Sequence, residues 1–368
     1  MSAQKAKTFG TAVDRWSGLG PYYAMFPVGF AFDVVSEFSE PGDKVLDPFA
    51  GRASSIFAAH ALGRSGSGIE INPVGWLYGK TKMHPASDAN VVARLEEIGR
   101  NAHTVTEEEL AGMPQFFHYC YTKNVLRFLL YARRHLKWQT SRVDGTLMAI
   151  ILVDLHGKEG SALSNQMRQG KAMSPDYSIA WWQERQKTPP DIDPTPFLKK
   201  KIVWRYSKGI PKFNSRAIIY GDSLKLLPRL NQRSGSSKYK LLFTSPPYYS
   251  ITNYFYDQWL RIWMLGGPAY PTYDGRSRWQ KKFDSKEGYK QLLKSVFTHS
   301  KKLLSKDATL YIRTDARKFT LDTTLEVLVN LYPEKTFECV SRPTGKLSQT
   351  ALFGDKSIKP GEVDIILR

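Results

Sequence analysis

The fold is decided by one stretch of the sequence, residues 44–71, which reads KVLDPFAGRASSIFAAHALGRSGSGIEI. Residues 44–49 are predicted to form a short apolar strand, and Gly51 opens a turn after it. Residues 53–62 have the pattern of a helix, and residues 65–71 form a second strand. A strand, a glycine turn, a helix and a second strand are typical of the start of a parallel α/β sheet.

The same alternation returns after residue 215, and a helix precedes the first strand at residues 30–38. Short apolar runs predict strands, whereas apolar residues three or four positions apart predict helices. The predicted C-terminal strands are residues 216–223, 239–243, 308–313 and 362–367, and the predicted helices are residues 225–230, 286–304 and 320–331. We therefore expect residues 1–80 and 211–368 to be the two halves of one α/β domain.

Residues 81–210 interrupt this alternation. The predicted elements are helices at 92–100 and 124–136, an apolar helix or buried strand at 144–155, a polar loop at 157–178 and a Pro-rich connection at 188–197. We expect this segment to be an inserted, mostly helical region with long loops.

The charge of the chain indicates a polyanionic partner. The 368 residues carry 53 Lys and Arg against 34 Asp and Glu, a net charge of +19. Such an excess is most often found in proteins that bind nucleic acid, and the alternative is a basic surface that maintains solubility. Two cysteines, Cys120 and Cys339, are too few for a zinc cluster or a disulfide framework. The N-terminus lacks a signal peptide and no apolar run could span a bilayer, so we expect a cytoplasmic protein.

Three polar motifs follow predicted strands. Asp47-Pro48-Phe49-Ala50-Gly51 offers a glycine turn and a helix start, where backbone N–H groups can approach a ligand. Glu70 ends the second strand, where a carboxylate can accept both hydroxyls of a ribose. Asp222 follows a later strand, where it could accept from an adenine amino group or cap the next helix. Each motif, taken singly, is equally compatible with a purely structural role.

A fourth motif, Thr244-Ser245-Pro246-Pro247-Tyr248, follows an apolar strand. The two prolines end strand pairing and stiffen the loop. A rigid loop with carbonyl and hydroxyl acceptors beside an aromatic ring is suited to holding a planar exocyclic amine. A Pro-Pro turn without chemistry is the alternative interpretation.

Together the four motifs, LDPFAG, GIEINP, YGDSLKLL and FTSPPY, resemble in this order the S-adenosylmethionine-dependent amino-methyltransferases of DNA. The resemblance covers roughly residues 20–80 and 215–368. It implies a Rossmann-like α/β methyltransferase sheet with the helical insertion between a cofactor half and a catalytic half. The preceding segment PYYAMFP is similar to the family segment that helps cover the methionine end of the cofactor. One departure is Gly51-Arg52-Ala53, where the family often has Gly-Ser-Gly.

The resemblance also implies site residues and an activity. The implied cofactor residues are Tyr22, Phe26, Pro27, Asp47, Pro48, Phe49, Gly51, Glu70 and Asp222, and the implied catalytic residues are Ser245, Pro246, Pro247 and Tyr248. Ser-Pro-Pro-Tyr is most like the cytosine-N4 enzymes, which act on duplex DNA after flipping the base. Adenine-N6 DNA methylation, RNA guanine-N2 methylation and non-catalytic nucleic-acid binding are the alternatives. The reaction requires no metal, and the enzyme could be solitary or have a restriction endonuclease as partner.

The insertion combines basic and aromatic residues, a composition that fits phosphate anchoring and contact with unstacked bases. The candidate DNA-binding residues are Arg133, Arg134, Gln166, Arg168, Lys171, Lys199, Lys200 and Lys201. A solvated basic face above a core-facing aromatic stripe is the alternative. The position of the insertion between the two halves resembles that of a target-recognition region.

Overall fold

The computed structural model describes residues 10–21, 26–233, 238–249, 254–271, 285–342 and 361–368. They contain a seven-stranded sheet with the order β3-β2-β1-β4-β5-β7-β6. The strands are β1 Lys44–Asp47, β2 Ser65–Glu70, β3 Ile218–Tyr220, β4 Tyr239–Thr244, β5 Leu304–Asp315, β6 Phe337–Arg342 and β7 Glu362–Leu367. Strands β1 to β5 pair in parallel, and β7 is antiparallel to both β5 and β6. The predicted α/β fold class is confirmed.

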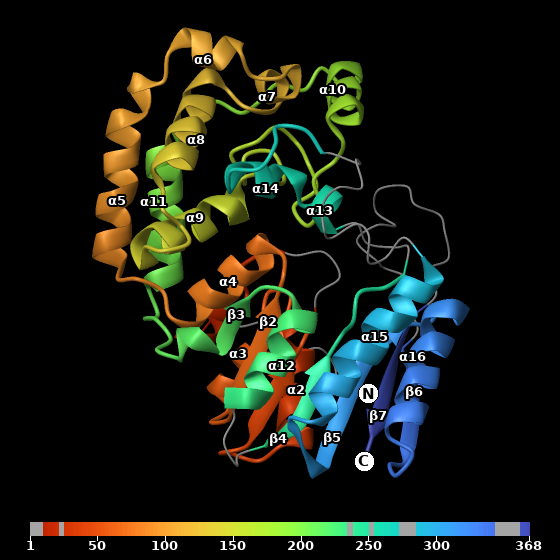
Figure 1. Ribbon diagram of the computed structural model, residues 1–368. Coiled ribbons are helices and arrows are strands. Elements are labelled where there is room, and N and C mark those ends of the chain that lie inside the picture. The colour runs from red at the N-terminus through yellow and green to blue at the C-terminus, as the bar shows by residue number, and fades with distance from the viewer. Residues whose placement is uncertain (1–9, 22–25, 234–237, 250–253, 272–284, 343–360) are drawn as a thin grey trace.

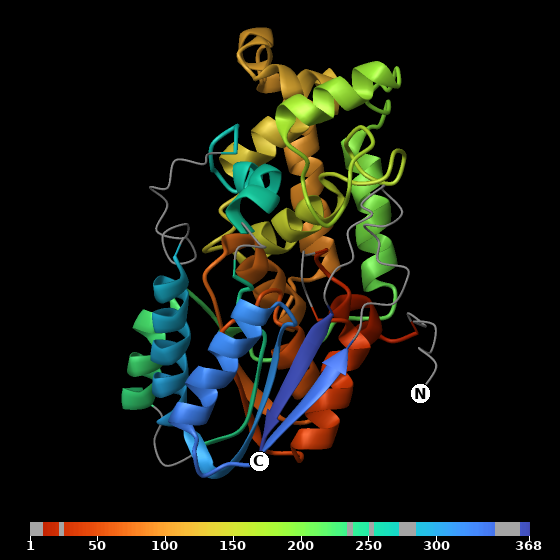
Figure 2. The same cartoon turned by 90° about the vertical axis from the view of Figure 1, so that its right-hand side faces the viewer.

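Helices cover both faces of this sheet (Figures 1 and 2). The helices α2 Val28–Phe38 and α3 Ser54–Ala61 lie on one face, and α12 Ser223–Arg233, α15 Lys286–Lys301 and α16 Lys318–Leu331 lie on the other. Consecutive residues of β1 alternate between the two faces: Val45 packs in the core with α2 and α3, and Leu46 in the core with α15 and α16. Each buried strand therefore contributes to both cores.

The inserted region forms a helical lobe above the carboxyl ends of the parallel strands (Figure 1). Its elements are α5 Asp88–Asn101, the 3-10 turn Ala102–Thr104, α6 Glu107–Ala111, α7 Gln115–Cys120, α8 Lys123–His135, α9 Arg142–Asp154, α10 Pro175–Glu184 and α11 Pro194–Tyr206. Helix α4 Pro73–Met83 leads into the lobe, and the 3-10 turn Ser215–Ala217 leads out of it. The short N-terminal helix α1 Ala12–Ser17 packs against α11, with the rings of Trp16 and Tyr206 5.0 Å apart.

A second segment joins the lobe from the C-terminal half. Helices α13 Tyr254–Asp257 and α14 Trp259–Met264 pack there, with Trp263 4.5 Å from the ring of Phe117. Arg261 is fully buried and donates from Nε to the carbonyl of Leu152 at 2.9 Å. The expected boundary at residue 210 therefore does not separate the lobe from the catalytic half.

Several local predictions need correction. Of the two alternatives expected for residues 144–155, a helix or a buried strand, the structure has the helix, α9. The expected Pro-rich connection at 188–197 contains the start of α11. There the Asp193 carboxylate accepts from the N–H of Thr195 at 3.0 Å, and Pro194 occupies the first turn, where a missing N–H is harmless. The elements that were not predicted are α1, α4, α6, α7, α10, α11, α13 and α14 and strand β6. No helix in the described part of the chain is long and apolar enough to cross a membrane.

Candidate active site

The four predicted motifs meet at one edge of the sheet. Asp47 ends β1, Glu70 ends β2, Asp222 lies two residues beyond β3, and Ser245 directly follows β4. These strands are neighbours in the order β3-β2-β1-β4, and all four run in parallel. Their carboxyl ends therefore form a continuous line, the usual place for a ligand in an open α/β sheet.

Asp47 joins the first motif to the fourth. Its Oδ1 accepts from the Thr244 hydroxyl at 2.7 Å and from the Phe49 N–H at 3.0 Å, and its Oδ2 accepts from the Ser55 hydroxyl. The side chain is 1% exposed, and this burial raises the pKa of Asp47 to about 6. The carboxylate of Asp47, a predicted cofactor residue, joins the two loops through these hydrogen bonds. The partners Thr244 and Ser55 were not predicted.

The turn after β1 keeps the backbone shape that a glycine-rich loop would have. Gly51 has φ 55° and Ala53 has φ 60°, so the alanine adopts the left-handed conformation although it is not a glycine. Ala53 is fully buried, and the absence of a side chain at Gly79 on α4 leaves room for its methyl group, since a Cβ there would lie 3.0 Å from the Ala53 Cβ. Gly79 of α4 therefore makes the space for Ala53, the residue that stands where the family often has its second glycine.

Glu70 is fixed by two backbone amides. Its Oε2 accepts from the Gly51 N–H and its Oε1 from the Asn72 N–H, both at 2.6 Å. Burial raises the pKa of Glu70 to about 8. A carboxylate oxygen has two lone pairs, so each oxygen can accept one further hydrogen bond.

Gly75 in α4 was not predicted, yet it shapes the same corner of the site. A Cβ at this position would lie 2.8 Å from the Gly51 carbonyl oxygen and 3.2 Å from the Glu70 Cγ. The glycine therefore permits α4 to pack directly against the turn and its acid.

Asp222 and Ser223 start α12 beside the first motif. The Asp222 Oδ1 accepts from the Leu224 N–H at 3.0 Å, which is a capping interaction. The Ser223 hydroxyl donates to the carbonyl of Pro48, and the Gly221 N–H donates to the carbonyl of Glu70 at 2.9 Å. The loop after β3 is thus attached to both neighbouring motifs.

In the TSPPY loop, which holds the predicted catalytic residues, Pro246 and Pro247 are buried, whereas Ser245 and Tyr248 are partly exposed. The Ser245 hydroxyl donates to the Tyr248 hydroxyl at 3.4 Å, and the Tyr248 hydroxyl donates to Glu362 Oε1 at 2.8 Å. Glu362, the first residue of β7, was not predicted as part of the site.

The PYYAMFP segment is described only in part. Tyr22 lies outside the described residues, whereas Phe26 stacks on Phe243 of β4 at 4.6 Å with an interplanar angle of 15°. Pro27 is exposed and precedes α2. Phe26 thus lies directly behind the strand that leads into the catalytic loop.

The candidate DNA-binding residues are spread over the lobe, and most have protein partners. Lys199 pairs with Glu96 at 2.8 Å, Lys201 with Asp154 at 3.1 Å and Lys171 with Asp257 at 2.5 Å, while Arg134 pairs with Glu109. The Arg133 guanidinium donates to the carbonyls of Trp263 and Gly267 at 2.8 and 3.0 Å. Gln166 Oε1 accepts from the Glu159 N–H, and the Arg168 carbonyl contacts His156 Nδ1 at 2.7 Å. Lys200 is exposed.

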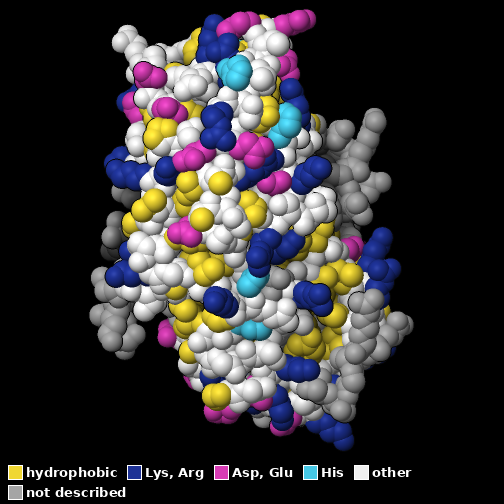
Figure 3. All heavy atoms as spheres, turned by 90° about the vertical axis from the view of Figure 1, so that its left-hand side faces the viewer, with side chains coloured by type: hydrophobic (Ala, Val, Ile, Leu, Met, Phe, Trp, Pro, Cys, Tyr) yellow, Lys and Arg dark blue, Asp and Glu magenta, His cyan; other side chains and the backbone are white. Residues whose placement is uncertain are grey.

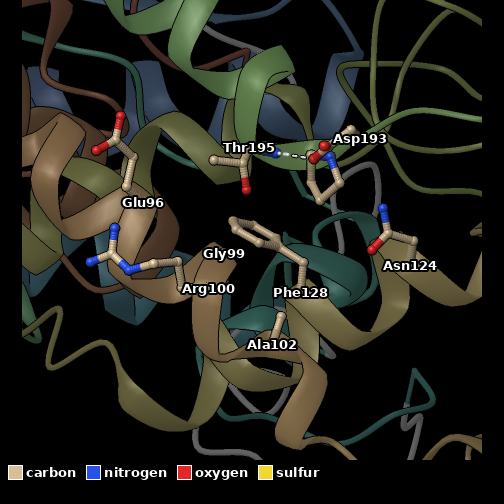
Figure 4. A pocket seen from close by; sticks show the side chains of 9 residues that line it. Glu96, Gly99, Arg100, Ala102, Asn124, Phe128, Asp193 and Thr195 are labelled. Carbon is tan, nitrogen blue, oxygen red and sulfur yellow. Dashed lines mark hydrogen bonds between the residues drawn. The ribbon is translucent and has the colours of Figure 1, made fainter.

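The face of the lobe that carries α5 is mixed in charge. Figure 3 shows Lys and Arg side chains dispersed over it, with Asp and Glu among them. A pocket of about 390 Å³ opens between α5, α8 and the start of α11, and Figure 4 shows Phe128 between Asn124 and Thr195 in it. Its lining residues all belong to the lobe, so this pocket is separate from the four motifs.

A family match covers the N-terminal part of the chain. Residues 3–74, which include three of the quoted segments, match a family described as DNA methylase. No curated protein matches the chain. A solved structure of a SAM dependent methyltransferase from Agrobacterium tumefaciens is similar, with 10% identity and a TM-score of 0.35. The alignment covers 94% of this chain and 63% of that one. The family match supports the predicted resemblance over residues 3–74, the region that carries the first two of the four motifs.

Proposed function

We propose that this protein transfers a methyl group from S-adenosylmethionine to the N4 amine of cytosine in duplex DNA. The observation that carries the proposal is the direct hydrogen bond from Thr244 of the TSPPY loop to Asp47 of the DPFAG loop. This hydrogen bond joins the TSPPY loop, which is suited to holding an exocyclic amine, to the DPFAG loop, which is suited to binding a nucleotide-like cofactor. The family match over residues 3–74 supports DNA methylation as the reaction.

The residues at the strand ends fit the cofactor. Glu70 has acceptor capacity for the two ribose hydroxyls, and Gly51 lacks a side chain that would hinder the approach of a ligand. Asp222 lies just beyond the neighbouring strand β3, where it would accept from the adenine amine. The bound cofactor would supply a methyl group activated by a sulfonium. Among the described residues, no group of three His, Cys, Asp or Glu side chains is placed to hold a metal ion.

The catalytic loop would act by positioning. An aromatic amine is a poor nucleophile, because its lone pair is delocalised into the ring. The Ser245 hydroxyl and the Pro246 carbonyl would accept its two N–H groups and so favour a tetrahedral nitrogen. Tyr248 would stack on the base, and the preorganised dipoles would carry most of the rate enhancement.

The target base would have to leave the duplex, because its amine is otherwise buried in the base pair. The helical lobe above the strand ends is positioned to contact the DNA (Figure 1). We propose that Lys200 and the partly exposed cations Arg134, Lys171, Lys199 and Lys201 anchor phosphates, exchanging their carboxylate partners for DNA. Gln166 and Arg168 remain the candidates for reading base edges. A cognate restriction endonuclease and a cytoplasmic location remain predictions.

The direct experiment is nucleoside mass spectrometry after incubation of the protein with S-adenosylmethionine and duplex DNA. N4-methylcytosine is the expected product, and modification-sensitive sequencing of DNA from expressing cells would give its sequence context. Detection of N6-methyladenine instead would show that the target is adenine in DNA, and N2-methylguanine formed only in RNA would show that the substrate is RNA. Cofactor binding with no methylated product on any nucleic acid would overturn the proposal.

The affinity for S-adenosylmethionine should depend on pH through Glu70. The free protein raises the pKa of Glu70 to about 8, whereas ribose hydroxyls donate best to the ionised form. Affinity should therefore rise with pH up to about 8, by at most about tenfold per unit, and level off above it. Calorimetric titrations from pH 6 to 9 measure this, with Glu70→Gln as the control for titration of the ligand itself. An identical pH profile in the variant would refute the role of Glu70.

Gly75→Ala should disturb the cofactor corner. The new Cβ would collide with the Gly51 carbonyl, so we expect a loss of about 1–3 kcal/mol in the free energy of unfolding. Binding of S-adenosylmethionine should weaken because the turn must move. Gly29→Ala is the matched control: no heavy atom lies within 4 Å of the added Cβ, and a gain of about 0.4–1 kcal/mol is expected. Equal stability and cofactor affinity in the two variants would contradict the prediction.

A further inference from the structure

A row of three hydrogen-bonded side chains, Ser245, Tyr248 and Glu362, connects the TSPPY loop to strand β7. Tyr248 donates its single proton to Glu362 Oε1 at 2.8 Å, since an ionised carboxylate can only accept. The Tyr248 oxygen therefore faces Ser245 as an acceptor, and the Ser245 hydroxyl donates to it at 3.4 Å. All hydrogen bonds of the row point in one direction, from Ser245 through Tyr248 to Glu362.

Glu362 is held on a rigid part of the sheet. Strand β7 pairs with β5 so that Glu362 lies opposite Asp315 and Asp364 opposite Arg313. The Arg313 guanidinium makes a bidentate pair with Asp364 at 2.6 and 2.8 Å, and its NH1 lies 3.4 Å from Glu362 Oε2. Asp364 is fully buried. Glu362, which accepts the hydrogen bond from Tyr248, is thus held by Arg313, and Arg313 is itself fixed by its bidentate pair with Asp364.

The strand pairing does not require Glu362. Arg313 already has a buried carboxylate partner in Asp364, which also accepts from Tyr311 at 2.7 Å and from Arg342 at 2.9 Å. The Glu362 side chain is 39% exposed and lies at the carboxyl edge of the sheet, beside the TSPPY loop. Glu362 is partly exposed, Arg313 does not need it as a partner, and it is hydrogen-bonded to Tyr248 of the TSPPY loop. These three features together point to a role in the reaction.

We propose that Glu362 is a positioning residue for methyl transfer. By fixing the Tyr248 hydroxyl it directs the Ser245 proton toward Tyr248, which leaves the Ser245 lone pairs free to accept an N–H of the target amine. It also fixes the plane of the Tyr248 ring, on which the base would stack. The charge-assisted bond to Glu362 makes this orientation present before the substrate arrives. This inference rests on the proposed function.

A double-mutant cycle tests the row. Glu362→Ala and Tyr248→Phe should each lower kcat on cytosine-containing duplexes by about tenfold, because each removes the same charge-assisted bond. The affinity for S-adenosylmethionine should stay unchanged. The double variant should be no slower than Tyr248→Phe alone, since the two residues act as a unit. Glu362→Gln, whose carbonyl can still accept from Tyr248, should recover part of the loss.

Glu338→Ala is the matched control, because Glu338 is an acid on the adjacent strand β6 whose partner is Arg368 at 3.6 Å. It should leave kcat unchanged. Unfolding midpoints confirm that each variant is folded, and Glu362→Met, which also lacks the carboxylate acceptor, replaces Glu362→Ala in the cycle if the latter is unstable. An unchanged kcat in the folded Glu362 variant, or additive losses in the double variant, would overturn this inference while wild-type activity upholds the proposed function. A wild-type protein that transfers no methyl group would overturn both.

Discussion

Replacing Ser245 or Tyr248 with alanine is expected to lower methyl transfer by about a hundredfold or more. Ser245→Ala removes an acceptor for the target amine, and Tyr248→Ala removes the ring on which the base would stack. Neither side chain is among the residues that hold the Gly51 turn or Glu70, so cofactor binding should stay nearly intact. Single-turnover methylation assays and calorimetric titration with S-adenosylmethionine measure the two effects separately.

The comparison with the neighbouring Tyr249 provides a control for general damage to the loop. Tyr249 packs against Tyr289 and Phe319 at 5.7 and 4.8 Å, on the side of α15 and α16. Tyr249→Phe keeps this packing and should retain activity. Wild-type turnover in a folded Ser245→Ala protein would remove the TSPPY loop from the reaction.

Asp47→Ala is expected to cost about 3 kcal/mol or more of the free energy of unfolding. The change leaves the Thr244 and Ser55 hydroxyls and the Phe49 N–H without their buried acceptor. Asp47→Asn should be far milder, because its carbonyl can accept from Thr244 and Phe49 while its amide donates to Ser55. Chemical denaturation of both variants measures the difference.

The pH dependence distinguishes the buried charge from the hydrogen bonds. Folding raises the pKa of Asp47 from 3.8 to about 6, so the ionised form is disfavoured in the folded state. The resulting destabilisation is absent below pH 3.8, grows as the pH rises toward 6 and is constant above it. Stability should therefore shift in favour of Asp47→Asn by up to about 3 kcal/mol between pH 4 and 7. A pH-independent difference would mean that burial does not disfavour the charge.

The strand patterns and motifs along the chain were sufficient to predict a parallel α/β sheet and to place the candidate site residues at its strand ends. Strand patterns at β1, β2, β4 and β7 depend on local sequence alone, and parallel strands place the residues that follow them at a common edge. The sequence therefore predicted correctly that Asp47, Glu70, Asp222 and Ser245 lie at strand ends or just beyond them. Strand β6 escaped prediction because it is an edge strand whose residues are mostly exposed, without a regular alternation.

Only the tertiary structure decided which atoms meet. Asp47 and Thr244 are 197 positions apart, and Tyr248 and Glu362 are 114 apart, so their hydrogen bonds depend on β4 lying between β1 and β5 and on β7 pairing with β5. The partners of the lysines at 199 and 201 likewise come from distant helices. Local sequence determines whether a segment is a strand or a helix. The order of strands, which brings Glu362 to the catalytic loop, is set by packing across the whole sheet.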